Sequence, residues 1–267
     1  MKRIFKVLSV LAGLLCVGCL VLLFQFHRTY KKSSEEYAGI ANEAVRIKNI
    51  QNPTEEKAEP EEVPPLLSVD FEALQAINGE VYAWIDFPGQ ERSYPVVQSE
   101  NNEYYLNHTF KGYENLCGSI FADCRNSGIF TDSNTVLYGH NMRNLSMFGF
   151  LRKYQEEEYY KAYPYFDIYL SESTYRCRIL ACCKVAADWS NFPTQFADEE
   201  ERKEFIGKMM DSCAYETIAP DAENERPLVM LSTCTGRGHT YRLILLAEAY
   251  EVAEMQKAEE NSGEKNE

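Results

Sequence analysis

Hydrophobic residues are concentrated at the start of the chain, where residues 7–26 form an uncharged, mostly apolar run of 20 positions. A helix rises about 1.5 Å per residue, so a run of this length crosses the roughly 30 Å hydrocarbon core of a bilayer. A cleaved signal peptide is the alternative, but the run is long for one, and no small-x-small site follows Phe26. We therefore expect an uncleaved transmembrane anchor over residues 7–26, preceded by a short segment of residues 1–6.

A second helical pattern follows the apolar run. Ser33 and Glu36 fit a capping box, and apolar residues recur at helical spacing over 37–50. Residues 52–65 are acidic and rich in proline, which is typical of a linker or an extended segment. Residues 33–65 are thus predicted to be a juxtamembrane helix and an acidic linker.

From residue 66 the pattern changes to short apolar, aromatic or β-branched runs separated by turns. Eight such runs predict a closed barrel or a sandwich. They cover residues 81–85, 94–97, 119–121, 135–138, 165–170, 175–187, 228–233 and 241–250. Helical patterns are expected over 70–77, from about Asn144, and over 198–213, and the charged tail 251–267 is predicted to be disordered.

The charge is strongly uneven along the chain. Six of the 27 Lys and Arg residues and none of the 41 acids lie in residues 1–32, which leaves 21 bases against 41 acids, a net charge of −20, in the remainder. A surface of that charge argues against binding nucleic acid or anionic lipid surfaces. We expect it to be mainly a solvated, repulsive surface.

Nine cysteines are present, two of them in the apolar run. The seven others form no C-x-x-C pair, and the acids show no calcium-loop spacing, so we expect no metal and no cofactor. Seven thiols fit one free reactive cysteine with up to three disulfides, and they fit reduced buried cysteines equally well. If one bridge forms, Cys117 and Cys124 are the expected pair.

Residues 230–246 place two chemically distinctive side chains close together. Cys234 ends an apolar run and meets a turn containing Gly236 and Gly238, which puts it at a rim rather than in a core. Although most cysteines are small buried hydrophobes, a rim position suits a nucleophile. Arg242 opens the next apolar run, where a guanidinium needs either an acidic partner or a developing anion to stabilise.

Of the four histidines, His140 is the preferred general base. It follows the run 135–138 and one glycine, which again places a side chain at a rim. His239 is five residues past Cys234 but is expected at a loop surface, and His108 is expected to have a structural role.

These residues resemble a sortase, and specifically a class B sortase. The family signature T-L-x-T-C corresponds to residues 230–234 (MLSTC), with Met230 in place of the first Thr, and the family's Y-G-H-N corresponds to 138–141. The Arg of the next strand corresponds to Arg242. Further similarity lies in residues 81–89, 94–98, 102–112 and 118–126, so the resemblance covers about residues 66–250, the expected catalytic domain.

The resemblance implies a mainly β fold: the sortase-type eight-stranded β-barrel, with N-terminal helices and a long helix (198–213) between strands six and seven. Those helices point to class B. A pilin-polymerising class would carry an Asp-Pro-aromatic lid, and the proline-rich stretch 52–65 has no such triplet.

The resemblance also implies a mechanism. Cys234 would attack the Thr carbonyl of an NPxT-like C-terminal sorting motif to give a thioacyl-enzyme, His140 would act as acid and base, and Arg242 would stabilise the oxyanion or orient the substrate. An amine of the peptidoglycan precursor or cross-bridge would then attack the thioester, and the protein would be joined to it by a new amide bond. The implied substrate contacts are Asn102, Leu106, Ser232, Thr233, Trp189 and Phe192; plain core packing is the alternative for Leu106, Trp189 and Phe192.

The implied partners are secreted proteins with a sorting signal, the wall amine and the membrane, with no nucleic acid. The implied location is the cell membrane, single-pass, with residues 1–6 cytoplasmic and the catalytic domain extracellular. Alternatives are a sortase of pilus assembly or attachment and a non-catalytic membrane-anchored barrel that binds a peptide or wall component. An L,D-transpeptidase is rejected, because it needs a Gly directly before the Cys, where this chain has Thr233, and a His much closer than His140.

Overall fold

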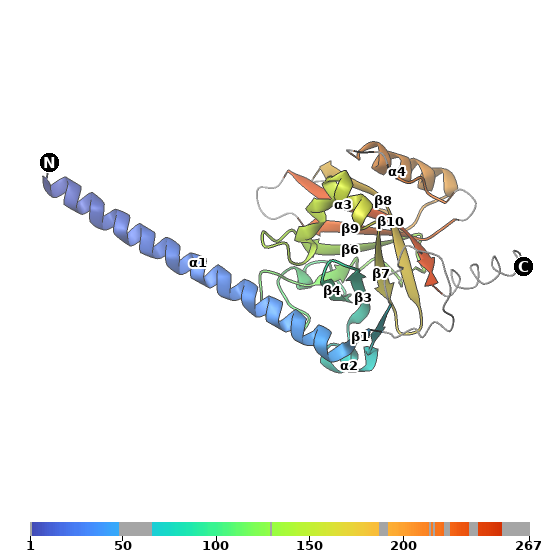
Figure 1. The fold of residues 1–267 in the computed structure, drawn as a ribbon, viewed down its shortest axis with the longest axis horizontal. Helices are drawn as coiled ribbons and strands as arrows, with labels where there is room; N and C mark the ends of the chain where they lie inside the picture. The colour runs from blue at the N-terminus through green and yellow to red at the C-terminus, as the bar shows by residue number, and fades with distance from the viewer. Residues whose placement is uncertain are drawn as a thin grey trace, which may run out of the picture.

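The structure is a computed structural model that describes residues 2–47, 66–128, 130–186, 192–213, 215, 217–221, 225–234 and 240–252. Two parts are visible in Figure 1: a long N-terminal helix, and a β-barrel with short helices around it. The predicted linker 52–65 and most of the predicted tail 251–267 lie outside the described residues.

Helix α1 (Lys2–Ala44) is continuous, which corrects the prediction of a separate helix starting at Ser33. Residues 27–32 contain neither Gly nor Pro, so nothing interrupts the backbone hydrogen bonds between the apolar run and the amphipathic stretch. Ser33 is buried against the barrel and bonds the Cys117 thiol, rather than capping a helix. Among the described residues, α1 is the one helix long and apolar enough to cross a membrane.

Eight strands form a closed barrel, which confirms the mainly β, eight-stranded prediction. The strands pair in the order β10-β8-β7-β3-β4-β5-β6-β9, with β4–β5 and β6–β9 parallel. Their bounds are β3 (Val81–Phe87), β4 (Arg92–Val97), β5 (Ile120–Ala122), β6 (Asn134–His140), β7 (Tyr165–Tyr169), β8 (Thr174–Ala186), β9 (Leu228–Cys234) and β10 (Tyr241–Glu251). Each matches one of the eight predicted runs, because apolar and β-branched residues fill the closed interior.

The helices around the barrel agree in part with the sequence pattern. Helix α4 (Glu199–Asp211) lies between β8 and β9, the sixth and seventh barrel strands, as predicted. Helix α2 (Phe71–Ile77) is capped by the Asp70 carboxylate, which accepts from the Ala73 N–H at 2.9 Å. Helix α3 (Glu157–Ala162) and a small sheet of β1 (Val45–Ile47) with β2 (Leu67–Val69) were not predicted.

The predicted helix near Asn144 begins later and is not an α-helix. Leu145 and Met147 have positive φ angles of 64° and 50°, which no α-helix accommodates, and the Asn144 carbonyl oxygen Oδ1 accepts from Ser146 instead. The 3₁₀ helix η2 (Phe148–Gln155) starts only after this turn.

The expected bridge between Cys117 and Cys124 is wrong, because both cysteines are free. Cys117 is buried beside α1, and burial raises the pKa of its thiol. Cys124 is exposed beyond the end of β5. Cys16, Cys19, Cys177, Cys182 and Cys183 are free as well, and Cys213 donates from its Sγ to the Cys182 carbonyl at 3.1 Å. Strand pairing and the apolar core hold the described part of the barrel together.

Candidate active site

The parallel pair β6–β9 brings two chemically reactive residues together. His140, the last residue of β6, is the Cα partner of Cys234, the last residue of β9. Neighbouring strands lie about 4.8 Å apart, so the two residues are side by side at one end of the barrel. The side chain of Cys234 and the turn that carries His239 lie outside the described residues.

Strand β10 brings Arg242 to the same end. β9 and β10 pair antiparallel, with Ile244 opposite Ser232. One residue further, the Leu243 N–H donates to the Thr233 hydroxyl at 3.0 Å. Continuing this register by one more step places Arg242 across from Cys234, so Cys234 has His140 on one side and Arg242 on the other.

Gly139 precedes the histidine because the site has no room for a side chain there. A Cβ at this position would lie 2.5 Å from Ile120 Cδ1 and 2.7 Å from the Phe148 ring. Such distances are well inside van der Waals contact. The packing of η2 and β5 against the β6 backbone therefore fixes the end of β6 that carries His140.

We expect Gly139→Ala to lower the free energy of unfolding by about 1–3 kcal/mol, because the added methyl overpacks a buried site. Denaturant unfolding measures this loss. Gly207→Ala is the matched control, since its Cβ meets nothing within 4 Å in α4 and a gain of about 0.5–1 kcal/mol is expected. Equal stability of the parent and Gly139→Ala would show that the neighbours yield freely.

His140 is held by a backbone group that the sequence did not indicate. Its Nε2 lies 2.6 Å from the carbonyl oxygen of Leu106, in the short 3₁₀ helix η1 (Tyr104–Leu106). A carbonyl only accepts, so Nε2 carries a proton and Nδ1 is the nitrogen that gains or loses one. Burial lowers the pKa of His140, and the hydrogen bond to Leu106 partly opposes that shift.

This lowered pKa predicts a pH-dependent stability. The ordinary pKa of histidine is 6.5, and the pKa of His140 in the folded chain is lower. As the pH falls through and below about 6.5, the unfolded chain therefore binds this proton more readily than the folded chain does, and the free energy of unfolding decreases. His140→Gln lacks this proton linkage. We expect the stability of the parent, relative to His140→Gln, to decrease as pH falls from 7 towards 5, measured by urea unfolding. A difference that is constant with pH would contradict the buried neutral imidazole.

A polar network around the buried Asp123 carboxylate adjoins the end of β6. The Tyr138 hydroxyl donates to Asp123 Oδ2 at 2.8 Å, and Arg125 binds the same carboxylate through two nitrogens at 2.9 and 2.7 Å. Burial would raise the pKa of Asp123, but these hydrogen bonds outweigh it and the pKa is below its ordinary value. Burial and then Asp123 raise the pKa of Tyr138, while Arg242 is close enough to lower it, so Arg242 lies near this network.

The network carries residues that sequence reasoning did not single out. Asp123 and Arg125 fall in the stretch 118–126, which carried part of the family similarity, but nothing in the pattern assigned them a role. The Arg125 guanidinium also donates to the Phe192 carbonyl at 3.0 Å. The network thus connects β5, β6 and the segment before α4.

The predicted substrate contacts on β9 are buried. Ser232 is wholly buried, and among the described residues its hydroxyl has no hydrogen-bond partner. The Thr233 hydroxyl is also buried and joins β9 to β10 through Leu243. Ser232 therefore has an unused polar atom one residue before the pair Thr233–Cys234.

The other predicted contacts lie on two separate segments. Asn102 accepts from the Cys124 N–H at 2.8 Å, which ties the approach to η1 to the end of β5. Leu106 is half-buried and supplies the carbonyl that holds His140. Phe192 is fully buried, as in core packing, and Trp189 lies outside the described residues.

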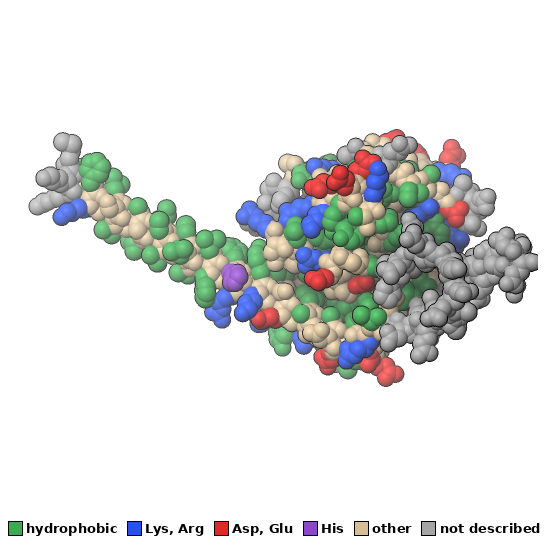
Figure 2. Space-filling view, viewed as in Figure 1, with side chains coloured by type: hydrophobic (Ala, Val, Ile, Leu, Met, Phe, Trp, Pro, Cys, Tyr) green, Lys and Arg blue, Asp and Glu red, His purple; other side chains and the backbone are tan. Residues whose placement is uncertain are grey.

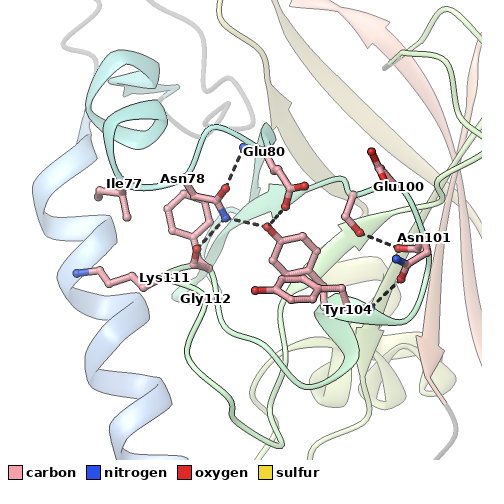
Figure 3. Close-up of a pocket in the computed structure, with 11 residues that line it drawn as sticks. Ile77, Asn78, Glu80, Glu100, Asn101, Tyr104, Lys111 and Gly112 are labelled. Atoms are coloured by element: carbon pink, nitrogen blue, oxygen red, sulfur yellow. Dashed lines mark hydrogen bonds between the residues drawn. The ribbon is translucent and has the colours of Figure 1, made fainter.

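A hollow of about 480 Å³ opens on the other side of η1 (Figure 3). Asn78 donates from Nδ2 to the Tyr105 hydroxyl at 2.8 Å, and that hydroxyl donates to Glu80 at 2.5 Å. None of the residues that line it is a predicted catalytic or substrate-contact residue. Its polar groups bond the Tyr105 side chain and so hold η1, whose last residue is Leu106.

Comparisons with known proteins show which proteins this chain resembles in sequence and fold. No family model matches the sequence. Sortase B of Listeria monocytogenes is 34% identical over 161 residues, which is 60% of this chain and 65% of that protein, just under two thirds of its length. Sortase B of Staphylococcus aureus is 24% identical over 253 residues, covering 94% of this chain and 100% of that protein.

The solved structures supply the deciding observation. The crystal structure of sortase B from B. anthracis in complex with AAEK1 matches with a TM-score of 0.68 at 28% identity, covering 84% of this chain and 98% of that one. Sequence similarity and the shared barrel fold together support a class B sortase. The same similarities indicate a sortase-type cysteine transpeptidase. Helix α1 of this chain is long and apolar enough to span a membrane.

Proposed function

We propose that this sortase cleaves a sorting motif after its Thr through a thioacyl-enzyme and transfers the protein to an amine of the cell wall. The observation that carries the proposal is the strand register that puts His140, Cys234 and Arg242 side by side on β6, β9 and β10. A nucleophile, a base and a fixed cation at one rim are the parts that acyl transfer needs.

In the acylation step, the Cys234 thiol gives its proton to Nδ1 of His140 and the thiolate attacks the Thr carbonyl carbon. The Leu106 carbonyl holds the imidazole through Nε2, so Nδ1 stays available for this exchange. Arg242 stabilises the oxyanion with its guanidinium fork. The C–N bond then breaks, and the departing amine takes the proton from His140.

In the transfer step, the amine of the peptidoglycan precursor or cross-bridge attacks the thioester carbon. His140 accepts a proton from the attacking amine, and the C–S bond breaks to release the Cys234 thiolate. The protonated His140 returns that proton to the sulfur, which restores the thiol and the neutral imidazole. The buried neutral form of His140 favoured in the free enzyme suits the role of base at both steps.

For the sorting motif we propose the NPxT-like class, as the resemblance implies. Ser232 is the proposed contact within the barrel. Its hydroxyl is buried and has no hydrogen-bond partner among the described residues, and a peptide amide that displaces the atoms covering it would satisfy it. The proposed contact set also includes Asn102, which precedes η1, and Leu106, which lies in η1. Its remaining members are Thr233, Trp189 and Phe192. Thr233 also has the structural bond to Leu243 described above.

Ser232→Ala separates substrate binding from folding. Removing a buried hydroxyl that has no protein partner is expected to leave the free energy of unfolding unchanged or slightly higher. The KM for the sorting peptide is expected to rise about tenfold, in line with one lost hydrogen bond. Steady-state kinetics and urea unfolding on the same preparation measure both. A loss of stability with unchanged KM would instead make Ser232 a structural residue.

We further propose that α1 anchors the protein in the cell membrane as a single span, with residues 1–6 cytoplasmic and the catalytic domain outside the cell. The proposal is supported by the uncharged run 7–26 and by its exposed side chains in α1. Protease protection of the full chain in membrane vesicles tests it. We expect protease added on the extracellular side of the membrane to digest the barrel. Protection of the barrel from protease added on that side would mean that the orientation is reversed.

A further inference from the structure

The loop of residues 107–118 runs along α1 and turns back. The Lys111 N–H donates to Glu36 at 3.1 Å, the Asn115 amide reaches the Thr29 carbonyl at 3.5 Å, and the Tyr37 hydroxyl donates to the Gly118 carbonyl at 2.7 Å. The loop therefore descends α1 from Glu36 to Thr29 and returns to Tyr37. Its residues 113–116, here called the tip, lie nearest the N-terminal end of the helix.

The tip is level with the end of the apolar run. Thr29 is three residues beyond Phe26, which at about 1.5 Å per residue is roughly 4.5 Å along the axis. The Lys32 ammonium lies 5.2 Å from the centre of the Tyr113 ring, so that ring is near the same height. A bilayer that encloses the run up to Phe26 has its headgroups at this level.

The side chains at the tip have the character of a membrane-interface contact. Tyr113 is 54% exposed and Leu116 is 60% exposed. Leu116 lies in a turn in which the Gly118 N–H donates to the Asn115 carbonyl. Aromatic residues and flanking bases are enriched where proteins meet the headgroup layer. Figure 2 shows Lys and Arg side chains gathered on α1 near the point where it meets the domain.

The local charge also suits this contact. Arg28, Lys31 and Lys32 lie on α1 beside the tip, and Lys31 is paired with Glu35 at 3.6 Å. Glu114 is the one acid in residues 107–118. The net charge of −20 found earlier belongs to residues 33–267, so the bases at this level are separate from the acidic surface.

We propose that the tip, with residues 28–32 of α1, contacts the headgroup layer of the bilayer. The proposal rests on the membrane span proposed above. Leu116 enters the interface between headgroups and acyl chains, Tyr113 lies in the headgroup layer, and the bases bind lipid phosphates. The loop starts directly after Leu106, which holds His140, so this contact fixes the height of the active site above the membrane.

Tryptophan quenching by brominated lipid tests the contact. Full-length protein carrying Leu116→Trp is reconstituted in vesicles of phosphatidylcholine with a minor share of phosphatidylglycerol, the phosphatidylcholine being brominated near the headgroup end of its acyl chains. Tyr113→Trp is a second probe. Ile47→Trp is the matched control, because Ile47 is an exposed apolar residue beyond the far end of α1. Leu15→Trp, within the apolar run, reports the span itself.

After subtraction of the parent emission, we expect the added Trp of Leu116→Trp to emit at shorter wavelength than that of Ile47→Trp and to be quenched severalfold more strongly. One contrary result is that Leu15→Trp is quenched while Leu116→Trp and Tyr113→Trp both behave like Ile47→Trp. This result would overturn the lipid contact and leave the membrane span standing. A blue shift of Leu116→Trp without quenching would also overturn it, in favour of contact between copies of the chain. Absence of quenching in Leu15→Trp would overturn the span and the contact together.

Discussion

Cys234→Ala is expected to abolish both cleavage and transfer, with a loss of at least about 10⁴-fold in kcat, because without the thiol no thioacyl-enzyme forms. Single-turnover assays with a sorting peptide, with and without an acceptor amine, measure the two steps. The barrel is expected to stay folded, since Cys234 is the last residue of β9 and its β6 partner, His140, lies at the barrel rim.

Cys124→Ala is the matched control for this experiment. Cys124 is an exposed free thiol beyond the end of β5 and has no proposed part in the chemistry. We expect this variant to retain the activity of the parent. Turnover of the sorting peptide by Cys234→Ala at more than a trace level would remove the assignment of the nucleophile.

Arg242→Lys is expected to reduce kcat/KM about 10²- to 10³-fold, although the positive charge is kept. Lys presents a point charge, whereas the guanidinium presents a planar fork that matches an oxyanion or a carbonyl in two directions. The effect should be mainly on kcat, because the interaction strengthens as charge develops on the oxygen. Steady-state kinetics with the sorting peptide measure this separation.

Arg178→Lys provides the comparison for that substitution. Arg178 is an arginine of β8 that pairs with Glu248 at 3.0 Å and is remote from the β6–β9 end. We expect it to change stability more than kcat. Near-parent kcat/KM in Arg242→Lys would mean that Arg242 has a structural role and that another group stabilises the oxyanion.

The sequence predicted the barrel well because its signal is local. Each of the eight strands coincides with a short apolar or β-branched run, and such runs are bounded by turn residues whose conformational preferences act over a few positions. The same logic placed His140, Cys234 and Arg242 at strand ends. The pattern alone also brought Cys234 and Arg242 together, because they lie on consecutive strands joined by one turn. Placing His140 beside them depends on strand order, and that expectation came from the family resemblance.

The features that were missed depend on tertiary contacts. The Leu106 carbonyl that holds His140 is a backbone group, so no residue type signals it. The capping box at Ser33 was a correct local pattern, but an uninterrupted helix and burial against Cys117 outweighed it. The Cys117–Cys124 bridge failed for a similar reason, because a spacing of seven residues says nothing about which side of the loop each thiol faces.

Peptide cleavage and transfer by the full-length protein in detergent are the direct test of transpeptidase activity, and a panel of fluorogenic peptides measures both. The panel contains Asn-Pro-x-Thr-x and Leu-Pro-x-Thr-Gly sequences, each with and without an oligoglycine or a diaminopimelate-type amine, and mass spectrometry identifies the products. We expect cleavage after Thr in the Asn-Pro-x-Thr-x peptides, together with a new amide product that forms only when the amine is present. Intact peptides throughout, with the Cys234 thiol confirmed to be reduced, would contradict this expectation.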